Sequence, residues 1–265
     1  ASDVYKRQMQ DWKRLGEQIT EWILDYAKTN GITTLVVGVS GGIDSAVSST
    51  LCAKTGLRTI ALSMPIHQIE SQNNLSMKHC EWLSSNWNNV ETDTVDLSVT
   101  FDSISHALGS KGDSEMALAN TRARLRMATL YAFAASNNGI VVGTGNKVED
   151  FGVGFYTKYG DGGVDISPIA DLYKSEVFSL AGSLGVIKEI QEAPPTDGLW
   201  DDGRTDEDQI GATYQELEWA MREVENPSKA GLSDRQKQVM ERYLQLNKAN
   251  SHKMDPIPVF KNGDR

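Results

Sequence analysis

The chain has 265 residues, of which 39% are hydrophobic and 23% are charged, and this balance is typical of a globular protein with one sizeable core. The formal net charge of -10 disfavours nucleic acid and anionic membranes as partners, because a negative surface repels both. The sequence has no apolar run of the ~18 residues that a membrane-spanning helix needs, and it begins without the basic and apolar stretches of a signal peptide, so we expect a cytoplasmic protein.

Strand-like and helical patterns alternate through the first half of the chain. An amphipathic helix is predicted at about residues 5–29, and four strand-like runs follow it, separated by stretches with helical spacing. The predicted strands lie at 34–40, 58–65, 89–98 and 140–144, and the predicted helices between them lie at 44–56, 72–87 and 114–139. This alternation is typical of an α/β fold with an open parallel sheet and helices on both faces, in which ligands bind at the carboxyl ends of the strands.

The pattern changes after the fourth predicted strand. Residues 145–168 are rich in glycine and contain aromatic side chains, which in a compact domain indicates a functional loop. The remaining predicted helices lie at 171–185, at 205–225 with a Thr205/Asp208 capping box, and at about 233–249, before a tail broken by prolines. We expect a single domain over 1–265, with a nucleotide-binding core at 33–185 and C-terminal helices and tail at 186–265.

The sequence has two cysteines, Cys52 and Cys80, and neither lies in a CxxC or Cys/His cluster. The spacing therefore favours neither a disulfide scaffold nor a zinc site. Both cysteines fall within predicted helices, where we expect buried, reduced thiols, as in a reducing compartment.

The first predicted strand runs directly into the sequence Ser-Gly-Gly-Ile-Asp-Ser, where the next helix begins. Unpaired backbone N–H groups at a helix start bind anions, and Gly41 and Gly42 allow the backbone to approach one closely. Ser40 and Ser45 can donate hydroxyl hydrogen bonds, while Asp44 suits a cation that the anion also binds. The stretch lacks the GK[ST] of a Walker A loop, and the simplest alternative is an ordinary capped strand-to-helix turn. It resembles the pyrophosphate loop of ATP-pyrophosphatases, which split ATP between the α and β phosphates.

From this loop to the tail, the sequence resembles ammonia-dependent NAD synthetase. Six blocks carry the resemblance in the family's order: GVSGGIDSA at 38–46, NTRARLRM at 120–127, VVGTGNKVED at 141–150, FYTKYGDGGVDISPIADLYK at 155–174, APPTDGLWDDGRTDEDQIGATY at 193–214, and SHKM at 251–254. The last block departs from the family's usual His-Lys-Arg, because Met254 stands where the family has Arg. No amidohydrolase domain is attached, so the resemblance implies the short form that uses free ammonia.

The resemblance implies a Rossmann-like fold of the adenine nucleotide α-hydrolase type and the amidation of deamido-NAD. A carboxylate is a poor electrophile, because attack adds charge to a group that is already anionic. Transfer of AMP to the nicotinate carboxylate supplies a leaving group, and ammonia can then attack the acyl carbon through a tetrahedral oxyanion. The products are NAD, AMP and pyrophosphate.

The resemblance also assigns site residues. Asp44 and Glu149 are expected to bind Mg²⁺, since each follows a strand that ends at the same sheet edge and hard carboxylates suit this ion. Asp44, Lys174 and Asp165 are the expected catalytic residues. The expected ATP-binding residues are Gly38, Val39, Ser40, Gly41, Gly42, Ile43, Asp44, Ser45, Thr144, Lys174 and Thr196. The expected deamido-NAD-binding residues are Arg124, Lys158, Asp165, His252 and Lys253.

Each assignment has a plainer alternative in the sequence. Lys174 is otherwise an exposed helix residue, Arg124 one of three alternating arginines on a solvated helix face, and Glu149 a solvated loop acid. Asp165 can accept from a ribose hydroxyl or position an ammonium ion, and the sequence does not choose between the two. The polar loop at about 200–207 is expected to become ordered on ATP binding.

The family is homodimeric, with deamido-NAD bound across the interface, and the amphipathic helices at 5–29 and 114–138 are expected to supply that interface. Other pyrophosphate-loop ligases, such as the amidating half of GMP synthetase or a tRNA-modifying enzyme, are the nearest alternatives. A tRNA-modifying enzyme usually has a basic surface, which this composition disfavours. A non-catalytic ATP-binding module is the alternative of a different class.

Overall fold

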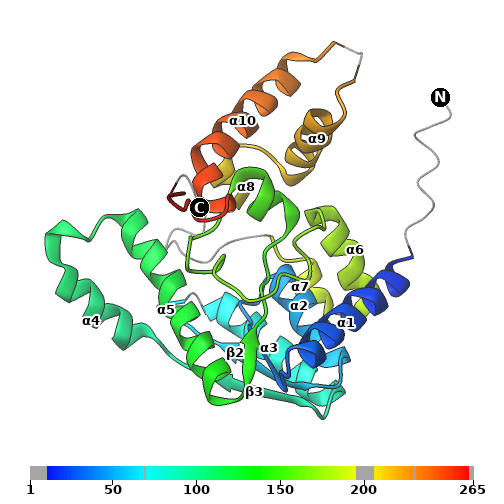
Figure 1. The fold of residues 1–265 in the computed structure, drawn as a ribbon, viewed down its shortest axis with the longest axis vertical. Coiled ribbons are helices and arrows are strands. Elements are labelled where there is room, and N and C mark those ends of the chain that lie inside the picture. The colour runs from blue at the N-terminus through cyan, green and yellow to red at the C-terminus, as the bar shows by residue number, and fades with distance from the viewer. Residues whose placement is uncertain (1–10, 69, 195–205, 229–230, 263–265) are drawn as a thin grey trace.

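The computed structural model describes residues 11–68, 70–194, 206–228 and 231–262. Within these residues, four parallel strands form one sheet in the order β3-β2-β1-β4. The strands are β1 (Thr34–Gly38), β2 (Arg58–Ser63), β3 (Val90–Thr94) and β4 (Gly139–Val141). The sheet and the helices around it confirm the expected α/β class (Figure 1).

Helices cover both faces of the sheet, which explains why its central strand is almost wholly apolar. Leu35 and Val37 of β1 point to one face, which is covered by α1 (Trp12–Thr29), α2 (Ile43–Lys54), α3 (Glu70–Asn86) and α6 (Lys174–Leu184). Val36 points to the other face, which is covered by α4 (Ser98–Leu108) and α5 (Glu115–Ser136). The alternation along β1 therefore separates two hydrophobic cores.

A third core lies beyond the carboxyl ends of the strands. It joins a π-helix (Val148–Val153), α8 (Asp206–Ile210), α9 (Tyr214–Glu225) and α10 (Asp234–Met254) around the buried side chains of Val148, Leu217 and Val239. These C-terminal helices are the yellow, orange and red elements above the sheet in Figure 1. They bring the C-terminal third of the chain over the edge of the sheet where ligands are expected.

The structure corrects one predicted helix. Residues 205–225 were expected to form a single helix, but α8 ends at Ile210 and α9 begins at Tyr214. Gly211 between them has a φ of 84°, a left-handed conformation that stops the helix. The capping box that starts α9 is Thr213 with Glu216, and the expected Thr205 lies outside the described residues.

Other element boundaries also differ from the predictions. The sequence predicted a strand to residue 98, but β3 ends at Thr94 and α4, which was not predicted, begins at Ser98. The expected loop at 145–168 contains the π-helix, and a short helix α7 (Lys188–Gln191) was also not predicted. At the C-terminus, α10 continues to Met254, so the residues 251–254 assigned to the tail form its last turn.

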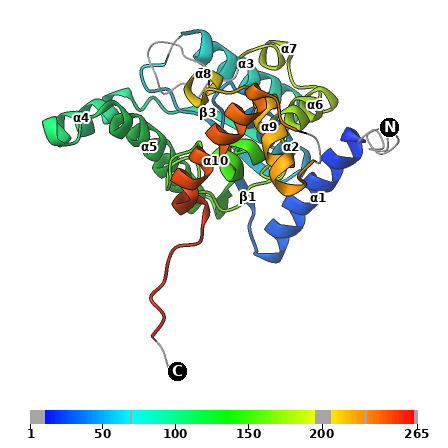
Figure 2. The same cartoon turned by 90° about the horizontal axis from the view of Figure 1, so that it is seen from above.

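The chain leaves the body of the molecule after α10. Figure 2 shows residues 255–262 as an extended segment that points away from the helices. Three of its apolar side chains are exposed, those of Ile257, Val259 and Phe260. Within the described residues, no helix has the length and apolar character needed to cross a bilayer.

Candidate active site

The loop between β1 and α2 is a closed hydrogen-bonded turn. Ser45 Oγ donates to the carbonyl oxygen of Gly42 at 2.9 Å and accepts from the backbone N–H of Ser40 at 3.2 Å. The N–H of Gly42 donates to Ser40 Oγ at 3.2 Å, and Gly41 takes a φ of 88°. The expected phosphate-loop residues lie together here, namely Gly38, Val39, Ser40, Gly41, Gly42, Ile43, Asp44 and Ser45. The turn presents the start of α2, where backbone N–H groups are unpaired, at the carboxyl end of the sheet.

Asp44, Glu149 and Lys174 meet beside this loop. Lys174 Nζ lies 2.5 Å from Asp44 Oδ2 and 2.9 Å from Glu149 Oε1. Lys174 is only 3% exposed, which rules out the alternative of a solvent-facing helix residue. The three residues lie in the first turns of α2, the π-helix and α6, so three separate elements converge on one largely buried charge cluster.

Asn146 fixes the relative positions of the two carboxylates, and the sequence analysis did not single it out. Its side chain is fully buried, and its Oδ1 accepts from the backbone N–H groups of Val148 and Glu149 at 3.0 and 3.2 Å. Because the oxygen is used in this way, the amide nitrogen faces Asp44 and donates to its Oδ1 at 3.1 Å. The signal in the sequence was the block around 141–150, but a buried amide cannot be distinguished there from a turn former.

Tyr214 is a second residue that the sequence analysis missed. Its hydroxyl lies 2.6 Å from Glu149 Oε1 and 3.0 Å from Asp206 Oδ2, and its ring lies 4.8 Å from Lys174 Nζ. A phenol in contact with two carboxylates remains protonated, and burial together with Glu149 and Asp206 raises its pKa. Tyr214 ends the fifth block of the family resemblance, yet nothing in that block indicates that it reaches the site.

Burial and charge set the protonation of the cluster. Burial lowers the pKa of Lys174, but Asp44 and Glu149 outweigh it, so its pKa rises and the ammonium stays charged. Burial raises the pKa of Glu149, whereas Lys174 and the Tyr214 hydroxyl together bring it below its ordinary value. Burial dominates at Asp44, whose pKa is raised despite Lys174. One ammonium is therefore shared between two carboxyl groups whose side chains are 17% and 16% exposed.

Two further acidic residues lie near this cluster. Burial raises the pKa of Asp150 well above its ordinary value, and the nearby carboxylates add to that shift. Asp161 accepts from the N–H of Thr157 at 2.9 Å. Asp161 is exposed as a whole residue, but its carboxyl group is shielded from water. This desolvation raises the pKa of Asp161 to about 6. Neither residue was singled out from the sequence.

Four of the expected deamido-NAD residues converge on the loop after the π-helix. Arg124 donates from Nε and Nη2 to the carbonyl of Lys158, both at 3.3 Å. Lys158 Nζ donates to the carbonyl of His252 at 2.6 Å. Lys253 Nζ donates to two carbonyls of the 154–156 turn, at 2.8 and 2.9 Å. The end of α10 is thereby tied to α5 through this loop, and burial lowers the pKa of Lys253.

Asp165 lies apart from that group. Its Oδ2 accepts from the backbone N–H of Val141 at 2.7 Å, and its Oδ1 accepts from the Tyr131 hydroxyl at 3.0 Å. The carboxylate thus occupies the outer edge of β4 and contacts α5. Thr144 follows the same strand two residues before Asn146, whereas Thr196 lies outside the described residues.

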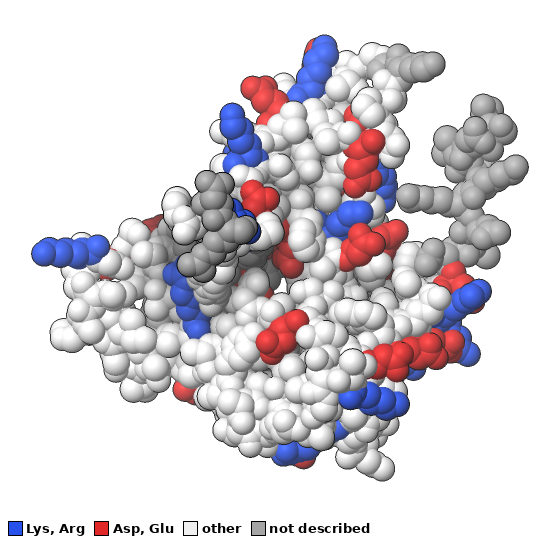
Figure 3. Space-filling model, viewed as in Figure 1, with Lys and Arg blue, Asp and Glu red and all other residues white. Residues whose placement is uncertain are grey.

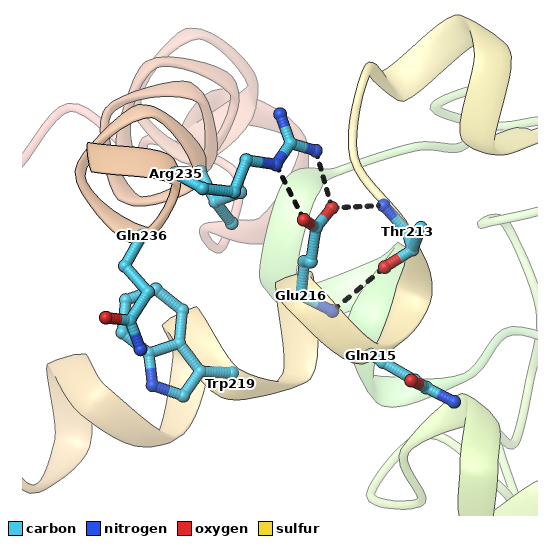
Figure 4. Close-up of a pocket in the computed structure, with 7 residues that line it drawn as sticks. Thr213, Gln215, Glu216, Trp219, Arg235 and Gln236 are labelled. Carbon is cyan, nitrogen blue, oxygen red and sulfur yellow. Dashed lines mark hydrogen bonds and ion pairs between the residues drawn. The ribbon is translucent and has the colours of Figure 1, made fainter. Parts of the chain in front are cut away.

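A pocket on the C-terminal helices is separate from this cluster. It is lined by Thr213, Gln215, Glu216, Trp219, Arg235, Gln236 and Val239, and Figure 4 shows Arg235 paired with Glu216 at its wall. Residues 215, 216 and 219 lie on the side of α9 opposite to Tyr214, because helix positions four apart share a face. The pocket and the charge cluster therefore occupy opposite sides of one helix.

The described residues contain no group of three or more His, Cys, Asp or Glu side chains arranged around a common metal position. On the face shown in Figure 3, basic and acidic side chains are interspersed, and no continuous basic surface is visible among the described residues.

Comparisons with known proteins show which family the chain belongs to. The family model for NAD synthase matches residues 15–257. A protein of Finegoldia magna named NH(3)-dependent NAD(+) synthetase is 36% identical over 226 residues, which cover 85% of this chain and 90% of that protein. The structure of NMN synthetase from Francisella tularensis has a TM-score of 0.82 at 33% identity, covering 95% of this chain and 98% of that one.

A second solved structure is also similar to this chain over nearly its whole length. The NH3-dependent NAD synthetase from Campylobacter jejuni, in complex with the nitrate ion, has a TM-score of 0.77 at 26% identity, covering 95% of this chain and 99% of that one. Sequence and structure agree over nearly the whole chain, and the chain belongs to the NAD synthase family.

Proposed function

We propose that this protein is an ammonia-dependent NAD synthetase, a ligase that converts deamido-NAD, ATP and ammonia into NAD, AMP and pyrophosphate. The observation that carries the proposal is the buried cluster of Lys174, Asp44 and Glu149 beside the phosphate loop, in a chain of the NAD synthase family. A non-catalytic nucleotide-binding module does not require a buried ammonium between two carboxyl groups beside an anion-binding turn, because burying such charges is costly.

The chemistry requires two displacements. A nicotinate carboxylate oxygen attacks the α-phosphorus of ATP, a bond forms to AMP, and pyrophosphate leaves. Ammonia then attacks the acyl carbon, the bond to AMP breaks, and the nitrogen loses a proton. The phosphate loop at 38–45 would hold the β and γ phosphates on its backbone N–H groups, and Lys174 would balance charge that grows on the departing pyrophosphate.

The carboxylates of Asp44 and Glu149 fit a Mg²⁺ ion. Both contact the same nitrogen atom of Lys174, at 2.5 and 2.9 Å, so one cation can reach both. Mg²⁺ is usually bound by one or two carboxylates together with substrate phosphates, which suits a pair without a third protein ligand. A bound Mg²⁺ would neutralise charge on the phosphates of ATP. Thr144 and Thr196 complete the proposed ATP-binding set.

Arg124, Lys158, His252 and Lys253 are proposed to bind deamido-NAD. Their mutual contacts through the loop after the π-helix support this, because they gather positive charge on a chain of net charge -10. Asp165 is proposed as a ribose or ammonium contact, since a carboxylate that accepts two hydrogen bonds still has free lone pairs.

We also propose a single domain over 1–265 that acts in the cytoplasm as a homodimer, with deamido-NAD bound across the interface. Trp22 and Tyr26 of α1 and Tyr131 of α5 support the dimer, because these aromatic side chains are partly exposed on the two helices expected at the interface.

A second candidate substrate follows from the Francisella tularensis structure, which is described as an NMN synthetase. The same two displacements on the carboxylate of a nicotinate mononucleotide would give NMN. The two substrates differ by the adenylate half of deamido-NAD, so a site that binds this half should prefer the dinucleotide.

One assay tests both candidates. The protein is mixed with ATP, Mg²⁺ and ammonium, together with deamido-NAD or with nicotinate mononucleotide, and AMP and the amide product are measured. We expect AMP release to depend on deamido-NAD and to yield NAD, with a higher kcat/KM than for the mononucleotide. AMP release without either substrate contradicts the proposed reaction, and a preference for the mononucleotide replaces the first candidate by the second.

A further inference from the structure

One face of α9 contacts Glu149 and the start of α6, the helix that begins with Lys174. Tyr214 and Glu218 are four residues apart, so their side chains share this face. Both are buried, at 6% and 3% exposure. Tyr214 contacts Glu149 directly, whereas Glu218 contacts the start of α6, the helix that begins with Lys174.

The contact with Glu149 fixes the orientation of its carboxylate. Tyr214 Oη and Lys174 Nζ both lie on Oε1 of Glu149, at 2.6 and 2.9 Å. Because this oxygen accepts from two donors that belong to different helices, rotation of the carboxyl group is restricted. Asp206 Oδ2 lies 3.0 Å from the same hydroxyl and contributes a second contact that holds the phenol in place.

The contact between Glu218 and α6 holds the start of that helix, and therefore Lys174, in position. Glu218 Oε1 accepts from the backbone N–H of Ser175 at 2.9 Å, and Oε2 accepts from the Ser175 hydroxyl at 2.7 Å. Ser175 is the second residue of α6, where backbone N–H groups lack partners within the helix and where a negative charge is stabilised by the helix dipole. Arg222, 3.3 Å from Oε2, keeps an opposite charge beside the buried Glu218.

We infer that Tyr214 and Glu218 are positioning residues that set the distance between Glu149 and Lys174; we call this pair the α9 clamp. The inference rests on the proposed Mg²⁺ and ATP site. Neither residue needs to touch a substrate for this role. Loss of either contact keeps Glu149 and Lys174 in the chain but lets the carboxylate or the ammonium shift. Mutation of residues that support metal ligands typically lowers metal affinity or activity by about 10–100-fold.

The clamp is tested with Tyr214→Phe, which removes only the hydroxyl and keeps the ring beside Lys174. We expect the Mg²⁺ concentration for half-maximal activity to rise, or kcat to fall, by about 10–100-fold, while KM for deamido-NAD stays unchanged. A readout without turnover is calorimetric binding of a non-hydrolysable ATP analogue with and without Mg²⁺. The variant should lose most of the Mg²⁺-dependent gain in affinity.

Glu218 is tested by comparing two variants. Glu218→Ala should cause a similar loss, and Glu218→Gln, which retains an acceptor oxygen for Ser175, should recover part of it. The double variant of Tyr214→Phe with Glu218→Ala should lose less than the product of the single effects, because both act on one pair. A full product of the two effects contradicts a joint clamp.

Glu216→Gln is the matched control, since Glu216 lies on the opposite side of α9 and pairs with Arg235 at 2.7 Å, while Gln keeps an acceptor for the Thr213 N–H of the capping box. It should lower the stability of the C-terminal helices without changing Mg²⁺ dependence or kcat. If Tyr214→Phe behaves like this control, the clamp is refuted while the proposed site stands. If the wild-type protein itself shows no Mg²⁺ dependence, the proposed metal site fails instead.

Discussion

At the scale of single residues, Lys174 is the most consequential side chain for stability, because its ammonium contacts two carboxyl groups that are largely removed from solvent. Lys174→Met keeps the length of the side chain and removes its charge. We expect a loss of about 3–5 kcal/mol in the free energy of unfolding, since Asp44 and Glu149, both largely removed from solvent, then lack their partner. Turnover should fall by about 10²–10³-fold, the usual effect of losing one stabilising donor.

Lys78→Met is the matched control for this prediction. Lys78 pairs with Glu189 at 3.5 Å, but both side chains are more than half exposed. Water and salt screen an exposed pair, so the control should change stability little and leave turnover intact. Urea unfolding and steady-state kinetics measure both effects. Equal stability of Lys174→Met and wild type would contradict the assigned charge cluster.

His79 gives a prediction about pH. It is fully buried in α3, and its Nε2 lies 2.9 Å from Ser49 Oγ of α2. Burial lowers the pKa of His79 to about 4 from an ordinary value of 6.5. Between these values the unfolded chain binds a proton that the folded chain does not, so stability is constant above pH ~6.5 and falls as the pH drops toward 4. The full effect is about 3 kcal/mol.

This pH dependence is measured by urea unfolding between pH 7.5 and 5, where most carboxylates stay ionised. His79→Gln should flatten the decline relative to wild type, whereas His106→Gln, on the exposed surface of α4, should not. Asp161 acts in the opposite direction, because its raised pKa makes the folded state bind the extra proton. The difference between the two variants therefore isolates His79, and identical slopes would exclude it as the cause.

At the scale of elements, the sequence predicted the strands and helices that bury a regular apolar pattern and missed those fixed by tertiary contacts. The four strands and the helices α2, α3 and α5 between them followed from alternation and spacing alone, whereas α4 did not. The π-helix at 148–153 did not, because Asn146 holds its first turn by accepting from two backbone N–H groups. Nor did the last turn of α10, which Lys253 anchors to the 154–156 turn.

The helix predicted at 205–225 shows the same limit of prediction from sequence, because a single residue breaks it. A glycine inside a helical pattern is tolerated in many helices, so Gly211 alone did not predict a break. With a φ of 84°, Gly211→Ala should cost about 1–2 kcal/mol, although an added Cβ meets no atom closer than 3.8 Å. The cost is therefore one of backbone conformation rather than of space.

Gly231→Ala is the comparison for this variant. Gly231 has no left-handed φ, and an added Cβ there meets no neighbour within 4 Å. Its replacement should leave stability unchanged or raise it slightly, since alanine reduces the freedom of the unfolded chain. Thermal or urea unfolding of both variants gives the answer. A neutral Gly211→Ala would mean that α8 and α9 can join without strain.

At the scale of the whole molecule, the site depends on the C-terminal third of the chain as much as on the sheet. The phosphate loop and Asp44 come from the first βα unit, but Lys174, Tyr214 and Lys253 come from elements up to 209 positions later, the difference between 253 and 44. The family resemblance supplied Lys174 and Lys253. Tyr214 and Asn146 emerged only from the fold, because their roles depend on contacts between distant segments.

The proposed dimer also belongs to this scale. Trp22 and Tyr26 of α1 keep large exposed surfaces, and their rings lie 6.2 Å apart, as an aromatic pair suited to a protein partner. If deamido-NAD binds across the interface, the active species is the dimer, and the specific activity should fall on dilution together with the dimer fraction.

Sedimentation velocity and activity are measured on the same dilution series. Trp22→Ala with Tyr26→Ala should shift both curves to higher concentration, whereas Val99→Ala, exposed on α4, should shift neither. A monomer at micromolar concentration with full activity would rule out a site shared between subunits.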